Sequence, residues 1–167
     1  MKSVISYWCV PGSPAFVKYE AVIERLCHSQ GAPKFQPHIT LGSATAEASN
    51  LDDIVAALKG VELDPLEIDQ RDVFTMSLFV RLGLTDQLKK ARQALEADPC
   101  FRPSRDFDPH ISLCYGTPPE DAAEREDVRA LLEMPIRIEK LLAVEITLPV
   151  EQHSDILSWK PVRTYPL

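Results

Sequence analysis

One seven-residue pattern occurs twice in this chain, and it constrains the possible folds more than any other feature. Residues 35–41 read FQPHITL, and residues 107–113 read FDPHISL. Phe, Pro, His, Ile and Leu are identical in the two copies, and the sixth position holds a hydroxyl residue in both. Since the whole chain contains only 4 histidines, the repeat places two of them in matching settings.

The repeated pattern predicts two equivalent β-strands, each with one apolar and one polar face. Side chains alternate between the two faces of a strand, so the Ile and Leu of each copy point to one side. The histidine and the hydroxyl residue share the other side, as His38 with Thr40 and as His110 with Ser112. The proline of each copy stands where the strand begins, where a missing N–H costs little.

Around these copies, hydrophobic periodicity predicts alternating strands and helices. Further strands are expected at residues 3–10, at 136–150 and 156–167, and as two strands within 61–82. Helices are expected at residues 14–31, 50–60, 85–98 and 120–134. The residues expected to cap or stop these helices are Ser13, Asn50, Thr85 and Gly31. Residues 73–80 alternate as a strand does.

This order of elements is a near duplication of one unit. It predicts an α+β fold in a single domain spanning residues 1–167. We expect two pseudo-symmetric lobes of antiparallel sheet, with helices on the outer faces and a central cleft where the two copies meet.

The composition argues against several classes of protein. A formal net charge of −7 and a pI near 5.1 weigh against binding of long nucleic acids, because such binding depends on basic residues. No apolar run reaches the roughly 18 to 20 residues that span a bilayer, and the N-terminus reads as a strand and not as a signal peptide. The 4 cysteines lack metal-binding spacing, and without an export signal we expect free thiols and a cytoplasmic location. We also expect a monomer with no membrane association.

Two imidazoles and two hydroxyls around one cleft suit the cleavage of a phosphate ester by acid and base. One neutral imidazole takes a proton from water, and the other, protonated, gives a proton to the leaving oxygen. The hydroxyls of Thr40 and Ser112 can donate to the phosphate oxygens. This chemistry requires no metal and no cofactor.

The repeat admits three other interpretations. A zinc site normally needs three or four ligands, and Asp106 and Asp108 near the second copy have no acidic equivalents near the first. A nucleophilic serine is disfavoured because the chain has no G-x-S-x-G elbow. The repeat could also survive from an ancestral duplication without any function.

The paired H-x-[T/S] strands in a small duplicated chain resemble the two-histidine (2H) phosphoesterase superfamily. The stretches SYWCVPG, FTMSLFVRL and PHISLCYG are similar to its cyclic phosphodiesterase branch in plants and yeast. The resemblance covers nearly the whole chain, but only the two histidine motifs are highly specific. It implies that His38 and His110 are the acid and base and that Thr40 and Ser112 bind phosphate.

The resemblance also implies that Tyr115, five residues after the second histidine, lines the site. Strict alternation places Tyr115 on the Leu113 face, so a bulge or a strand end must turn it inward. Trp8 and one of Phe74 and Phe79 are candidates for stacking on a base or ribose. The cysteine pair that the plant branch carries shortly before the second motif is absent, since Cys100 alone stands in that region.

The implied activity is the opening of ADP-ribose 1″,2″-cyclic phosphate or of nucleoside 2′,3′-cyclic phosphates. We expect His110 to act as the base that activates water and His38 as the acid. Alternatives are the processing of RNA 2′,3′-cyclic phosphate ends, a 2′–5′ RNA ligase-like activity, and a module that binds cyclic phosphates without turnover. The remaining histidines, His28 and His153, are read as structural.

Overall fold

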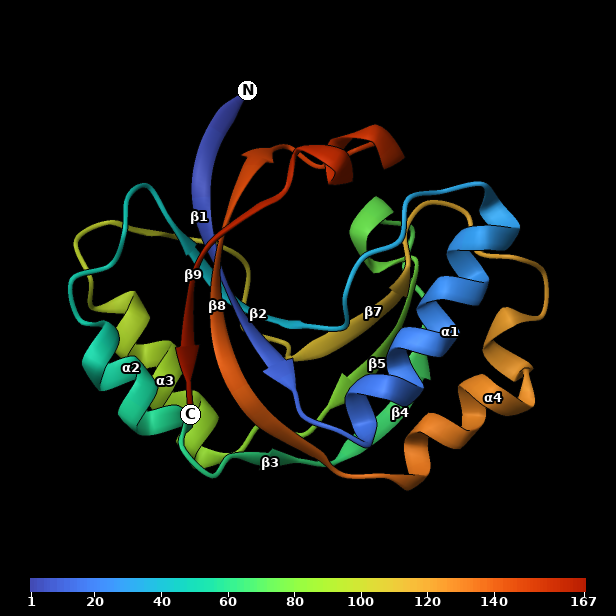
Figure 1. Cartoon of the computed structure of the whole chain (residues 1–167), viewed down its shortest axis with the longest axis horizontal. Coiled ribbons are helices and arrows are strands. Elements are labelled where there is room, and N and C mark those ends of the chain that lie inside the picture. The colour runs from blue at the N-terminus through green and yellow to red at the C-terminus, as the bar shows by residue number, and fades with distance from the viewer.

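The computed structural model describes residues 1–167 and contains two antiparallel sheets (Figure 1). The larger sheet has six strands in the order β3-β8-β1-β2-β6, with β9 paired to β8. Its strands are β1 (Lys2–Pro11), β2 (Ile39–Ala44), β3 (Glu62–Leu63), β6 (Phe101–Arg102), β8 (Ile136–Leu148) and β9 (Lys160–Pro166).

The smaller sheet has three strands in the order β4-β5-β7. They are β4 (Pro65–Asp69), β5 (Leu78–Leu82) and β7 (His110–Cys114). The two sheets contact each other through β2 and β7, the strands that carry the repeated motif. The duplicated segments, far apart in the sequence, are therefore brought together.

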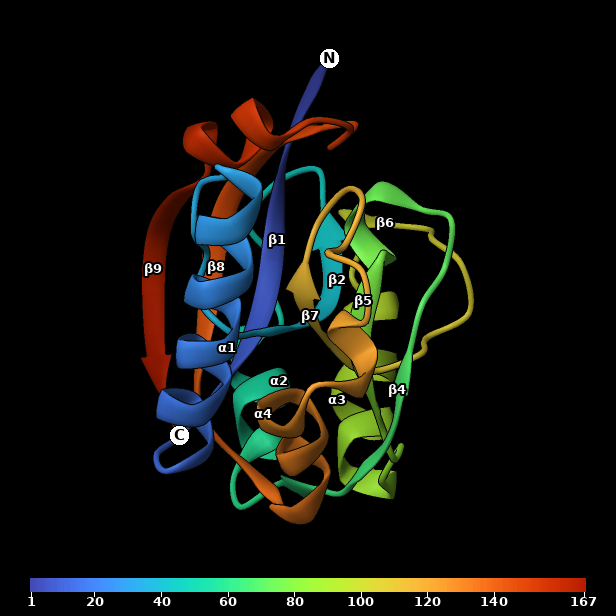
Figure 2. The same ribbon diagram turned by 90° about the vertical axis from the view of Figure 1, so that its right-hand side faces the viewer.

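Four α-helices flank the sheets, with α2 and α3 on one side and α1 and α4 on the other (Figures 1 and 2). They are α1 (Ala15–Gln30), α2 (Leu51–Leu58), α3 (Asp86–Glu96) and α4 (Glu126–Arg129). Short 3₁₀ helices are η1 (Phe74–Met76), η2 (Ala122–Glu124), η3 (Ala130–Glu133) and η4 (His153–Ser158). None of the helices combines the length and the apolar character needed to cross a bilayer.

Apart from the short strand β6 and the 3₁₀ helix η2, the element order repeats as β1-α1-β2-α2 and β5-α3-β7-α4. The helix of each unit packs on the motif strand of the other, since α1 contacts β7 and α3 contacts β2. This exchange joins the two units through a shared core. The predicted α+β fold of two duplicated antiparallel lobes is confirmed.

The apolar residues of the motif anchor both copies in that core. Ile39, Leu41, Ile111 and Leu113 are all fully buried in one hydrophobic cluster. Burial of one such side chain stabilises the fold by about 1.5–3 kcal/mol. The opposite faces of the same strands are thereby turned away from the core, as alternation predicts.

Each motif strand also carries a β-bulge at the same motif position. In the β1–β2 pair, Tyr7 is opposite Gly42 and Trp8 is opposite Thr40, which leaves Leu41 without a partner. In the β5–β7 pair, Leu113 is passed over in the same way. A bulge resets the alternation of the residues that follow it.

Several predicted helix ends are confirmed. Gly31 ends α1 in the left-handed conformation with φ of 63°, where glycine meets no steric penalty. The Thr85 hydroxyl accepts a hydrogen bond of 3.2 Å from the Leu88 N–H at the start of α3. Asn50 does precede α2, but its side chain donates to the Ala94 carbonyl and does not cap the helix.

Other boundaries differ from those predicted. Ser13 is not the N-cap of α1, because the helix begins one residue later with Pro14 at that position. Residues 73–80 are not one strand: η1 precedes β5, with the Met76 N–H bonded to the Val73 carbonyl. The helix expected at 120–134 is broken into η2, α4 and η3, because Arg125 is extended.

Candidate active site

The two motif histidines make the same hydrogen bond. Nδ1 of His38 lies 2.8 Å from the Gln36 carbonyl oxygen, and Nδ1 of His110 lies 2.8 Å from the Asp108 carbonyl oxygen. A carbonyl oxygen only accepts, so each Nδ1 carries a proton and donates it. In the neutral ring, Nε2 is then the nitrogen with a free lone pair. The duplicated sequence produces two imidazoles in one tautomer.

His38 is 7% exposed and lies flat against Trp8, with ring centroids 3.7 Å apart. Nε1 of Trp8 donates to the Ser6 hydroxyl at 2.9 Å, which holds the indole in place. Burial lowers the pKa of His38 to about 4, although the bond to the Gln36 carbonyl opposes this. The charge of His110 lowers that pKa further, so His110 is near enough for its charge to act on His38.

His110 occupies a more polar setting at the start of β7. Its ring meets Phe79 edge-on, with centroids 5.1 Å apart. Burial lowers the pKa of His110, the Asp108 carbonyl and carboxylate raise it, and Arg71 and Arg81 lower it. The shift is smaller than that of His38.

The two motif hydroxyls are not in the same state. Thr40 is exposed, and its hydroxyl makes no hydrogen bond within the protein. Ser112 is 7% exposed and donates to the Thr75 carbonyl at 2.8 Å. To donate to a phosphate, Ser112 must give up that bond, whereas Thr40 is free to donate.

Tyr115 lies beside Ser112, in accordance with the bulge at Leu113. Burial raises the pKa of Tyr115 well above its usual value, and hydrogen bonding by Ser112 opposes this rise. The Tyr115 ring stacks on Phe35, with centroids 4.3 Å apart. The bulge therefore turns Tyr115 to the side that bears the histidine and hydroxyl.

The other predicted aromatic contacts lie at different depths. Trp8 is 4% exposed, with one ring face against His38, so its observed contact is with the imidazole. Phe79 is fully buried against His110. Phe74 is half-buried on η1, where its ring stacks on Tyr115 with centroids 5.9 Å apart. Of these three rings, Phe74 is the one left open to a ligand.

Sequence reasoning missed two features of the site. Trp159 follows η4 and packs edge-on against both Trp8 and His38, with centroids 5.2 and 6.2 Å away. No local motif marks it, because the C-terminal segment reaches the site only through the tertiary fold. The second feature is a further repeat, in which Ser6 and Trp8 correspond to Ser77 and Phe79. Aligning SYWCV with SLFVR could have revealed it.

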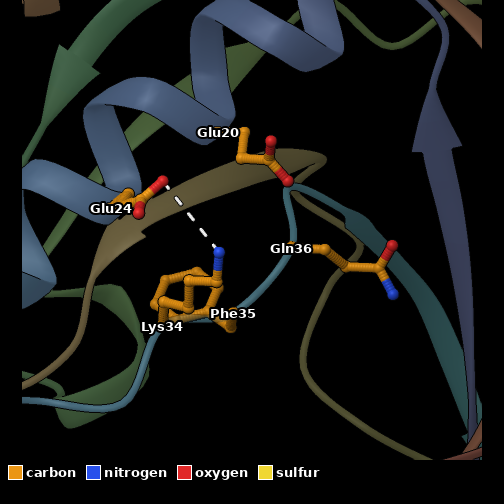
Figure 3. Close-up of a pocket in the computed structure, with 5 residues that line it drawn as sticks. All are labelled: Glu20, Glu24, Lys34, Phe35 and Gln36. Carbon is orange, nitrogen blue, oxygen red and sulfur yellow. Dashed lines mark ion pairs between the residues drawn. The ribbon is translucent and has the colours of Figure 1, made fainter.

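A separate hollow of about 140 Å³ lies between α1 and the segment before β2 (Figure 3). It is lined by Glu20, Glu24, Lys34, Phe35 and Gln36. The Lys34 ammonium nitrogen lies 4.0 Å from a carboxylate oxygen of Glu24. Neither motif histidine lines this hollow, and two carboxylates beside one ammonium do not suit a phosphate.

Comparison with known proteins identifies the family. The family model described as the 2′-5′ RNA ligase superfamily matches residues 19–148. A search of curated proteins found no matching sequence.

Solved structures share the fold. E. coli LigT complexed with NADP+ superposes with a TM-score of 0.54 at 13% identity, over 100% of this chain and 99% of that chain. A structure described as a phosphoesterase gives 0.52 at 15% identity, and E. coli LigT complexed with 3′-AMP gives 0.51 at 14%, with the same coverage. Identities this low show the fold alone, but the family model spans most of the chain. The chain belongs to the 2′-5′ RNA ligase superfamily, which is the superfamily of two-histidine phosphoesterases.

Proposed function

We propose that this chain is a metal-independent cyclic phosphodiesterase that hydrolyses a small nucleotide-derived cyclic phosphate. The observation that carries the proposal is the matched hydrogen bonding of His38 and His110, which leaves Nε2 of each ring available for proton transfer. His110 begins β7 and His38 directly precedes β2, and these two strands contact each other. Membership of a phosphoesterase superfamily supports the same chemistry.

The pKa shifts favour roles opposite to those expected from the sequence. His38 is the harder ring to protonate, since burial brings its pKa to about 4. It therefore suits the base, which takes a proton from the attacking water at Nε2. His110 keeps a pKa closer to its ordinary value and suits the acid, which donates its Nε2 proton to the ring oxygen as the P–O bond breaks.

The remaining side chains complete the site. Thr40 donates to a nonbridging oxygen of the phosphate, and Ser112 does so after it leaves the Thr75 carbonyl. Both donors would stabilise the negative charge that builds up on those oxygens in the transition state. Tyr115 lies beside Ser112, and Trp8 covers one face of the His38 ring and shields it from water.

Electrostatics favours a small substrate over a long RNA. The arginines nearest to His110 are already paired with carboxylates. Arg81 contacts Glu67 at 2.7 Å, Asp69 at 3.5 Å and Asp108 at 3.3 Å. Since these cations are neutralised by neighbours, they offer little attraction to a polynucleotide. ADP-ribose 1″,2″-cyclic phosphate and nucleoside 2′,3′-cyclic phosphates are the proposed substrates.

The superfamily match favours one second candidate, the processing or 2′–5′ ligation of RNA ends by the same residues. The two candidates differ in their salt dependence. Binding of an RNA end should weaken steeply as salt is raised, whereas turnover of a small cyclic phosphate should change little. Tight binding of a cyclic phosphate without any product would support the third alternative, a binding module.

The decisive experiment is to assay ring opening by phosphorus NMR with a chelator present. His38→Ala and His110→Ala should each abolish measurable turnover, because either loss removes one proton transfer worth about 10²- to 10⁴-fold. His28→Ala, at the exposed end of α1, is the matched control and should keep full activity. Ring opening that survives in the double variant of His38 and His110 would falsify the proposal.

The individual roles can be separated with a nitrophenyl phosphodiester. Nitrophenolate leaves without protonation, so this substrate has little need of an acid but still needs a base. We expect His110→Ala to retain far more activity on this ester than on a cyclic phosphate, and His38→Ala to lose activity on both. The reverse pattern would assign the base to His110.

A further inference from the structure

We infer that Arg71 and Arg81 act through Asp108 as positioning residues that hold the His110 imidazole in place. The inference rests on the proposed function for its kinetic consequence, but the arrangement is a property of the folded chain. It concerns the one variable position of the repeated motif, where the first copy has Gln36 and the second has Asp108.

Asp108 serves His110 with two different groups. Its backbone carbonyl accepts the hydrogen bond from Nδ1 of His110 at 2.8 Å. Its carboxylate forms ion pairs with both arginines, with Arg71 Nη2 at 2.9 Å from Oδ2 and Arg81 Nε at 3.3 Å from Oδ1. Fixing the carboxylate also fixes the peptide that orients the imidazole.

The arginines reach His110 by other routes as well. Arg81 stands opposite His110 in the β5–β7 pairing. The guanidinium of Arg71 lies over the Phe79 ring, 5.3 Å from its centroid, and that ring meets His110 at 5.1 Å. His110 is thus supported by a side chain from its own segment, by β5 and by the turn before η1.

Further carboxylates hold the arginines themselves. Glu67 and Asp69 on β4 contact Arg81 at 2.7 and 3.5 Å. Asp69 also lies 4.0 Å from Nε of Arg71. These five charged side chains come from β4, β5 and the segments just before η1 and β7. They form one network, and such networks fix geometry better than isolated surface pairs do.

Nothing similar supports His38. The Gln36 backbone carbonyl likewise accepts the hydrogen bond from Nδ1 of His38, but the Gln36 side chain lies at the hollow beside α1 (Figure 3). The His38 imidazole is held instead by its flat contact with Trp8. One histidine is therefore supported by charge and the other by burial, although their motifs are nearly identical.

The charges that face His110 act in opposite directions. The Asp108 carboxylate favours the protonated ring, and Arg71 and Arg81 disfavour it. His38 lies just before β2, and the charge of His110 lowers its pKa in turn. Because the signs differ, removing an arginine and removing the Asp108 carboxylate should shift the pKa of His110 in opposite directions. A purely structural role would not produce opposite shifts.

The experiment is an NMR titration of the His110 ring in the full-length protein, together with the pH profile of kcat. Arg71→Met removes a positive charge, so the pKa of His110 should rise. Asp108→Asn removes a negative charge, so that pKa should fall. Arg71→Lys keeps the charge and should restore the original pKa. Arg163→Met, which removes a remote and exposed charge paired with Glu47, should leave it unchanged.

In both shifted variants kcat should fall about tenfold, as for a misplaced acid, and one limb of the pH profile should move with the His110 pKa. If His110 is the acid, the alkaline limb moves. Shifts of equal sign in Arg71→Met and Asp108→Asn, or no shift in either, would overturn the inference. The titration needs no turnover, so a failure of the proposed function would be seen separately, as an inactive wild type.

Discussion

The indole of Trp8 lies flat on the imidazole of His38, with ring centroids 3.7 Å apart and an interplanar angle of 12°. The contact keeps water from one face of the histidine. Burial is the main reason that the pKa of His38 falls to about 4. Because Trp8 also stands opposite Thr40 in the β1–β2 pairing, this pair of strands supplies both the hydroxyl and the ring that covers His38.

Replacing Trp8 should therefore make His38 easier to protonate. In Trp8→Leu, water reaches the imidazole and the pKa of His38 should rise toward its ordinary value. As the proposed base, His38 must be neutral, so the acidic limb of the pH profile should move to higher pH. The lost aromatic packing should also lower the free energy of unfolding by about 3 kcal/mol.

NMR titration of His38 measures the first effect, and denaturant unfolding measures the second. Trp159→Leu is a useful control, because Trp159 meets His38 only edge-on at 6.2 Å and should shift its pKa less. An unchanged His38 pKa in Trp8→Leu would show that Trp8 does not keep water from the ring.

The buried neutral state of His38 should also make the fold sensitive to acid. Its folded pKa of about 4 lies below the value of 6.5 expected for the unfolded chain. As the pH falls from 6.5 toward 4, the unfolded chain binds a proton first, so stability is complete above this window and is lost through it. The contribution of this residue is about 3 kcal/mol.

Urea unfolding across the range from about pH 7.5 to pH 4.5 measures this loss. His38→Gln cannot titrate and should lose less stability over the same range than the wild type. Parallel losses in the two proteins would mean that His38 is not held neutral by the fold.

Much of the fold and of the candidate site could be predicted from the sequence, because the signals are local. The apolar face of each motif strand and the pairing of histidine with hydroxyl follow from alternation. The left-handed Gly31 and the capping Thr85 follow from backbone chemistry. These features depend on residues close together in the chain.

The parts that could not be predicted depend on neighbouring strands. The bulges at Leu41 and Leu113 are defined by the partner strands β1 and β5, not by the motif itself. The position of Tyr115 follows from one of these bulges. Trp159 reaches His38 only because the chain folds back after β8. The charge network at Asp108 likewise joins residues from three separate segments.

The two hydroxyls of the motif should separate stability from activity. Thr40→Val removes a hydroxyl that is exposed and has no partner in the protein, so the free energy of unfolding should change by no more than about 0.5 kcal/mol. Ser112→Ala removes the hydrogen bond to the Thr75 carbonyl and should cost about 1–2 kcal/mol. Both variants should lower kcat by about a hundredfold, as for the loss of a transition-state donor.

Thermal or denaturant unfolding and steady-state kinetics on a cyclic phosphate measure these effects. Thr40→Ser restores the hydroxyl and should recover most of the activity. Full activity in Thr40→Val would remove Thr40 from the proposed phosphate site while leaving the role of the histidines intact.

Phe74 should recognise the nucleoside portion of the substrate. It is half-buried, stacks on Tyr115 and meets His153 edge-on with centroids 5.3 Å apart. Stacking of a base on an aromatic ring contributes about 1–3 kcal/mol. Phe74→Ala should therefore raise KM for a nucleoside 2′,3′-cyclic phosphate by about tenfold, with little change in kcat.

The matched substrate is a methyl riboside 2,3-cyclic phosphate, which has the same reacting ring and no base. Phe74→Ala should leave its KM unchanged, because the lost contact is with the base alone. The control variant Val162→Ala, at an exposed position on β9, should affect neither substrate. Equal increases in KM for both substrates would mean that Phe74 shapes the phosphate site and does not stack on the base.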